Sequence, residues 1–166
     1  MQFDLLKFFR TATKPYQTEF SVDLSGQDFP GYQVPKAVTA RFEADLEGDL
    51  LRMELSAGAE VVAECARCLA PVQELFTVEK TYTLKERELT QEDNDLPIDL
   101  KGVLDLDELV YQELVLQIPT MLLCSPDCLG LCPVCGKKKG AGCTCQESEG
   151  SAPADPRLSI LRQLLN

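Results

Sequence analysis

Residues 38–55 read VTARFEADLEGDLLRMEL, and this stretch decides the predicted fold. Apolar and polar side chains alternate from Val38 to Leu46, and the alternation resumes from Leu51 to Leu55. A period of two is typical of a strand with one buried face. Because Glu47-Gly48-Asp49 is a turn sequence, the two segments are predicted to form an antiparallel hairpin.

Further strands are predicted on both sides of this hairpin. Side chains also alternate at residues 17–24 before it. After it, residues 61–65 and 72–84 are predicted to pair, with Ala57-Gly58 as the turn that precedes them. A CxxC pair of cysteines falls between these two strands, so its thiols are expected at the tip of a hairpin.

One amphipathic helix is predicted after an acidic segment at residues 85–97, which has few large apolar side chains and is expected to be a loop. Asp105 and Glu108 form a capping-box arrangement at its start, and Pro119 ends it. Between them apolar side chains recur at helical spacing, at Leu106, Leu109, Val110, Leu114 and Ile118. Residues 1–10 fit a short helix or the start of a strand equally well.

The sequence therefore predicts an α+β fold: an antiparallel sheet or small open barrel with one packed helix, a cysteine-rich zinc-knuckle C-terminal region and a short terminal helix. We expect an α+β core at residues 1–123, a zinc-binding extension at 124–145, a linker at 146–154 and a C-terminal helix at 155–166. Asp155-Pro156 supports the start of that helix, since proline is favoured at the first helical position.

The chain has eight cysteines and no histidine, and six of the cysteines lie between Cys124 and Cys145. Any metal site must therefore be built mainly from thiolate. Structural zinc takes four thiolates, as does an iron–sulfur cluster, whereas disulfides belong to oxidising compartments. The opening MQFDLLKFFRTATKP lacks the apolar core of a signal peptide. Zinc in a cytoplasmic protein is the preferred interpretation, with a cluster or redox-active thiols as alternatives.

The most economical zinc site combines Cys132 and Cys135 of the CPVCG turn with Cys143 and Cys145. Cys128 is an alternate ligand, because thiols one residue apart are awkward ligands for one ion. The count of eight also allows a second site, made of Cys65, Cys68, Cys124 and Cys128. For Cys124 the role of a small buried apolar residue is an equal alternative.

The net charge of −11 argues against broad affinity for nucleic acid, and no DNA binding is expected. Residues 84–113 alone hold ten acidic and three basic side chains. The one basic run, Lys137, Lys138 and Lys139, either balances the charge of a zinc–thiolate centre or makes a small contact to RNA or an acidic partner.

Catalysis and membrane insertion are both disfavoured. A chain without histidine cannot build a serine–histidine or cysteine–histidine nucleophile system, and no phosphate-binding glycine loop is present. No run of 18 apolar residues is available to span a bilayer. A non-catalytic protein is predicted.

A series of short motifs runs through most of the chain. They are CARCL at 65–69 followed by Pro71-Val72, IDL at 98–100, Glu108 and Glu113, LQIP at 116–119, CLGLCPVCG at 128–136 and DPRL at 155–158. Their order and spacing resemble the YceD-like family of bacteria and plastids.

The resemblance implies a role in the accumulation of 23S ribosomal RNA, through its synthesis, processing or stability. The implied partners are a 23S rRNA precursor, a nascent large-subunit particle or a large-subunit ribosomal protein. We expect the contacts at Lys137, Lys138, Lys139, Arg157 and Arg67. The alternative is a cytosolic thiol redox or metal-sensing module that uses its CxxC pairs.

Overall fold

The computed structural model describes residues 1–89, 95–140 and 143–145. The chain divides into two compact units, one from Met1 to Cys128 and one that begins at Leu129. All helices and strands of the described residues lie in the first unit. None of these helices is long and apolar enough to cross a membrane.

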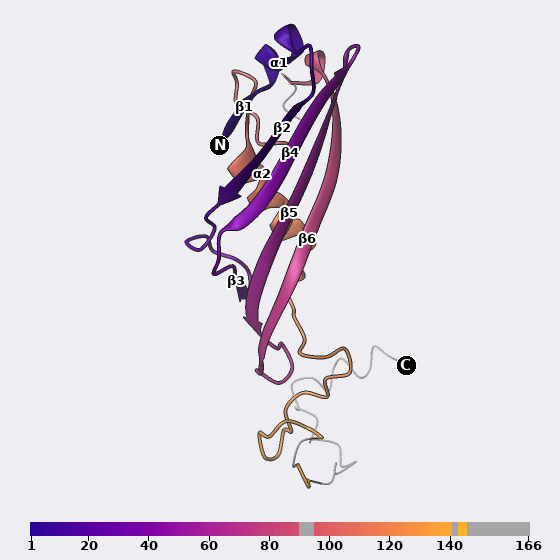
Figure 1. The fold of residues 1–166 in the computed structure, drawn as a ribbon. Coiled ribbons are helices and arrows are strands. Elements are labelled where there is room, and N and C mark those ends of the chain that lie inside the picture. The colour runs from indigo at the N-terminus through magenta and orange to yellow at the C-terminus, as the bar shows by residue number, and fades with distance from the viewer. Residues whose placement is uncertain (90–94, 141–142, 146–166) are drawn as a thin grey trace, which may run out of the picture. The chain divides into compact units, whose positions relative to one another are not determined.

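A five-stranded antiparallel sheet dominates the first unit (Figure 1). Its strands are β2 (Tyr16–Val22), β3 (Tyr32–Gln33), β4 (Val38–Glu47), β5 (Leu50–Glu64) and β6 (Pro71–Lys85). β5 is central: β4 and then the short β3 pair with one of its edges, and β6 pairs with the other along its whole length. β2 continues the sheet beyond β4.

A smaller sheet and two helices complete this unit. β1 (Gln2–Asp4) pairs with β7 (Val103–Asp105). Each of these strands leads directly into a helix, α1 (Leu5–Thr11) or α2 (Leu106–Gln117), and a short 3-10 turn spans Glu86–Glu88. The Asp105 side chain accepts hydrogen bonds from the backbone N–H groups of Asp107 and Glu108, so it caps α2 as its sequence predicted.

The core lies between α2 and one face of the large sheet. The alternation along β4 and β5 buries Phe42, Met53 and Leu55, and α2 contributes its apolar side to the same core. Figure 1 shows α2 running behind the sheet, where it contacts β5 and β6. The opposite face carries the polar side chains of these strands, as is usual when a sheet is covered on one side only.

One charged side chain is buried under α2. Glu113 is only 8% exposed. Its Oε1 accepts a 2.7 Å hydrogen bond from the Tyr82 hydroxyl, and its Oε2 lies 3.4 Å from Lys80 Nζ. Both partners belong to β6, so this group ties the helix to the strand. Burial of a carboxylate is tolerated because it is paired and hydrogen-bonded.

The fold confirms the predicted α+β class with antiparallel sheets and excludes a closed barrel. The predicted turn at Ala57-Gly58 is wrong, because β5 continues without a break from Leu50 to Glu64. Gly58 pairs with Thr39 on one side and with Thr77 on the other, so two neighbouring strands hold it extended. The ambiguous N-terminus contains both a strand and a helix. The predicted linker and C-terminal helix lie outside the described residues.

Candidate metal centres

The eight cysteines gather into two groups of four. We call Cys65, Cys68, Cys124 and Cys128 the hairpin tetrad, and Cys132, Cys135, Cys143 and Cys145 the C-terminal tetrad. Within each group the four sulfur atoms lie within 4.8 Å of one another. Tetrahedral zinc with bonds of about 2.3 Å separates its sulfur ligands by about 3.8 Å. Each tetrad is therefore close to the dimensions that one ion requires.

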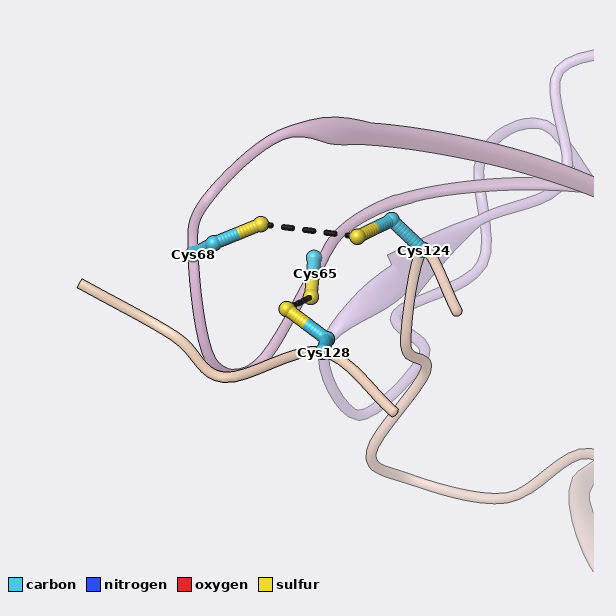
Figure 2. Close-up of side chains that lie close together, drawn as sticks. All are labelled: Cys65, Cys68, Cys124 and Cys128. Atoms are coloured by element: carbon cyan, nitrogen blue, oxygen red, sulfur yellow. Dashed lines mark hydrogen bonds between the residues drawn. The ribbon is translucent and has the colours of Figure 1, made fainter. Parts of the chain in front are cut away.

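The hairpin tetrad joins two segments that are far apart in sequence (Figure 2). Cys65 and Cys68 come from the tip between β5 and β6, and Cys124 and Cys128 come from the segment after α2. The Sγ atoms of Cys68 and Cys124 are 3.5 Å apart, and those of Cys65 and Cys128 are 3.8 Å apart. Cys124 is half-buried and the other three thiols are buried.

Hydrogen bonds hold the same two segments together. The Ala66 N–H donates to the Leu122 carbonyl at 2.9 Å, and the Arg67 guanidinium donates to the Cys128 carbonyl at 2.8 Å. One backbone and one side-chain hydrogen bond thus position the tetrad in addition to the contacts among its own sulfurs. Arg67, predicted as an RNA or partner contact, lies exposed on this tip with one donor group already in use.

The two CxxC turns have the same backbone geometry. In the first, the Leu69 N–H donates to the Cys65 carbonyl and the Cys65 N–H donates to the Ala70 carbonyl. In the second, Gly136 and Cys132 donate in the same way to Cys132 and Lys137.

Both turns end on a residue in the left-handed region, Leu69 at φ 59° and Gly136 at φ 68°. That conformation favours glycine, so the sequence indicates it at Gly136 of CPVCG but not at Leu69 of CARCL.

Backbone N–H groups aimed at the sulfurs favour thiolate at one position of each tetrad. The N–H of Cys124, assisted by those of Arg67 and Cys68, lowers the pKa of Cys65 to about 6. The N–H groups of Cys135 and Val134 likewise lower the pKa of Cys132 to about 6.

Other thiols of the tetrads resist ionisation. The Ala70 N–H lowers the pKa of Cys68, but burial and the neighbouring thiols outweigh it and raise that pKa to about 11. The neighbouring Cys135 side chain and partial burial raise the pKa of Cys145 to about 12. Four adjacent thiolates repel one another, so a bound dication is what would let all four ionise.

The C-terminal tetrad has little apolar support. Cys132 is buried, but Cys135 is exposed, and so are Leu129, Leu131 and Val134. A bridge between Leu131 and Lys138 and a bond from the Lys139 N–H to the Gly130 carbonyl form a short hairpin. A segment with so few buried side chains needs another source of stability, which a structural metal would supply.

The structure places the remaining predicted site residues as follows. Cys128 lies with Cys65 in the hairpin tetrad. Lys137 and Lys138 are exposed and Lys139 is half-buried, and all three lie in the hairpin that carries Cys132 and Cys135. Arg157 lies outside the described residues.

A closed set of four thiols leaves no position for substrate on the metal, which is characteristic of structural sites.

Both tetrads lie within the stretch of the chain that a family model matches. A model of the family described as "Large ribosomal RNA subunit accumulation protein YceD" matches residues 53–165. The uncharacterized proteins Rv2926c of Mycobacterium tuberculosis and Mb2951c of Mycobacterium bovis are each 34% identical over 129 residues, which cover 75% of this chain and 59% of each relative.

The uncharacterized protein ML1660 of Mycobacterium leprae is 29% identical over 86 residues, 47% of this chain and 38% of its own. The chain thus aligns with about three-fifths of the first two relatives. No solved structure matches. Since the family model covers well over half of the chain, this protein belongs to the YceD family of large ribosomal RNA subunit accumulation proteins.

Proposed function

We propose that this protein is a non-catalytic factor that promotes 23S rRNA accumulation or processing during assembly of the large ribosomal subunit, with one structural zinc ion in each tetrad. The observation that carries the proposal is the family match, which spans both tetrads. The family description supports the role in ribosomal RNA. The comparisons give no support to the alternative of a redox or metal-sensing module.

Zinc is the metal that suits both tetrads. It takes four thiolates at the observed spacing and undergoes no redox chemistry in the cytoplasm, where we place the protein. In the hairpin tetrad the ion would fix the segment after α2 to the tip between β5 and β6. In the C-terminal tetrad it would supply most of the folding free energy of the residues around it.

The proposed partner is a 23S rRNA precursor or a nascent large-subunit particle, with a large-subunit ribosomal protein as a further contact. The charge of −11 favours docking through few cationic groups. Lys137, Lys138 and Lys139 lie together on one short hairpin, and Arg67 lies on the other CxxC turn. Together with Arg157 they are the contacts we propose.

Depletion of the protein tests the function directly. We expect the ratio of 23S to 16S rRNA to fall, with unprocessed 23S precursor mapped in the depleted cells. An expression copy of the wild-type chain should restore the ratio. An unchanged ratio with normal subunit profiles would refute the assignment.

Charge removal tests the contact residues. The triple variant K137A/K138A/K139A should sediment less with precursor particles, and its binding should depend less steeply on salt, since up to three phosphate contacts are lost. The matched control is K7A/K14A/K101A, which removes three exposed lysines outside the C-terminal tetrad. Equal binding by the two variants would exclude the lysine hairpin as the contact.

A further inference from the structure

The strand β6 leaves a long edge of the large sheet open. It pairs with β5 from Pro71 to Lys85, and no strand of the described ranges pairs with its other edge. Figure 1 shows β6 as the outermost strand on its side of the sheet. Unpaired N–H and C=O groups along such an edge are a template for another strand. Its only proline is Pro71, at the first position, where it does not interrupt pairing.

The side chains of β6 that share the face of α2 have a symmetric order. Glu74 and Lys80 lie three residues before and after Thr77. Phe76 and Val78 flank the same centre, and Val72 and Tyr82 are equally distant from it. All six are on one face, because they alternate with the residues between them.

This order makes the strand complementary to itself. Two antiparallel copies of β6 centred on Thr77 place Glu74 of each copy opposite Lys80 of the other. Phe76 then lies opposite Val78, and Val72 opposite Tyr82. Opposite charges and apolar pairs directly across a ladder both stabilise it.

The present partners of the two charges leave room for this pairing. Glu74 is exposed and has no ion pair among the described residues. Lys80 Nζ lies 3.4 Å from Glu113 Oε2, and its side chain is 47% exposed. An ammonium group has three donors, so it can serve Glu113 and a second carboxylate. Charges on an edge strand commonly repel a neighbour, but here the sequence places unlike charges opposite each other.

We propose that two copies of this chain associate through β6, antiparallel and about a two-fold axis at Thr77. The two large sheets then form one continuous sheet, with both α2 helices on the same face. This interface is independent of the proposed role in ribosome assembly and of the metal tetrads.

Sedimentation equilibrium of the zinc-loaded full chain tests the interface. We expect the wild type to dimerise and E74K, which sets a lysine opposite Lys80 twice, to raise the dimer dissociation constant by about 30-fold. The matched control is E79K, the same charge change on the other face of β6, where the opposite residue is Leu75. Its dissociation constant should change by about threefold or less.

A charge exchange identifies the pairing. K80E alone sets a glutamate opposite Glu74 and should also dissociate. A mixture of E74K and K80E should form a heterodimer, because unlike charges then face each other at both positions.

Circular dichroism reports whether K80E, which loses its contact with Glu113, is folded. If K80E is unfolded, comparison of the dimer dissociation constants of E74K and E79K tests the interface. A wild type that stays monomeric at several hundred micromolar, equal effects of E74K and E79K, or two folded variants that fail to combine would each overturn the proposal.

Discussion

Removal of zinc from the hairpin tetrad should lower the free energy of unfolding of the first unit. The size of this loss follows from the number of residues in the loop that the tetrad closes. In the hairpin tetrad Cys68 and Cys124 are 56 positions apart, and in the C-terminal tetrad Cys135 and Cys143 are 8 apart. A cross-link that closes about 57 residues stabilises by about 4 kcal/mol, and one that closes about 9 residues by about 2.6 kcal/mol, in the chain-entropy model. The zinc ion proposed for each tetrad would act as this cross-link.

The assay is thermal unfolding of the first unit, followed by the strand signal in circular dichroism. Excess chelator should lower its midpoint by about 15 °C, from about 4 kcal/mol and about 4 °C per kcal/mol for a unit of this size. C68S should reproduce most of the loss. C135S is the matched control: its loop closes within the second unit, so the sheet transition should stay in place. Metal analysis should give two zinc ions in the wild type and one in each variant.

Two outcomes would contradict a metal cross-link in the hairpin tetrad. A chelator effect below about 1 kcal/mol on the sheet would show that the hairpin tetrad is not cross-linked by a metal. Equal shifts for C68S and C135S would show that loop length does not determine the effect.

Zinc binding at pH 7.5 should release fewer than four protons per ion, because Cys65 and Cys132, with pKa values of about 6, are already thiolates. The affinity for zinc should fall most steeply below pH 6, where protons compete with the metal at these two sulfurs as well. Calorimetry in buffers of different ionisation enthalpy measures the number of protons released. G102A should destabilise the first unit by about 2 kcal/mol or more, because Gly102 has φ 76° and an added Cβ would lie 2.6 Å from Leu6 Cγ. The control is G26A, whose added Cβ would have no atom within 4 Å, and it should change stability by less than about 0.5 kcal/mol. Urea unfolding measures both changes.

The sequence predicted those elements whose signals are local. The alternation around Phe42 and Met53 gives the central hairpin, because burial of one face requires that period. Asp105 caps the start of α2, and Pro119 directly follows its C-cap Ile118, so both signals act within one turn of the helix end. The turn predicted at Gly58 failed because pairing with strands on both sides overrode a weak local preference.

Spacing offered the observed grouping of the cysteines as one of several, with Cys128 as an alternate ligand of the C-terminal site, and could not decide among them. Cys65 and Cys68 meet Cys124 and Cys128 only because the tip between β5 and β6 lies beside the end of α2. That proximity depends on the packing of the helix on the sheet, with Glu113 held by β6. Counting eight thiols allowed two sites, but the partners of each thiol are a property of the tertiary fold.

The length of the β5–β6 ladder gives the hairpin tetrad a further consequence, for folding. Fifteen residues of each strand pair without interruption, and strands that alternate so regularly can slip by two positions while keeping their apolar side chains on the correct face. The CxxC turn prevents this, because a slip would lengthen or shorten the segment between Glu64 and Pro71 and pull Cys65 away from Cys128. The proposed zinc ion at one end of the ladder would therefore select the register of β6 against β5, and chains that fold without zinc should accumulate misaligned, aggregation-prone hairpins.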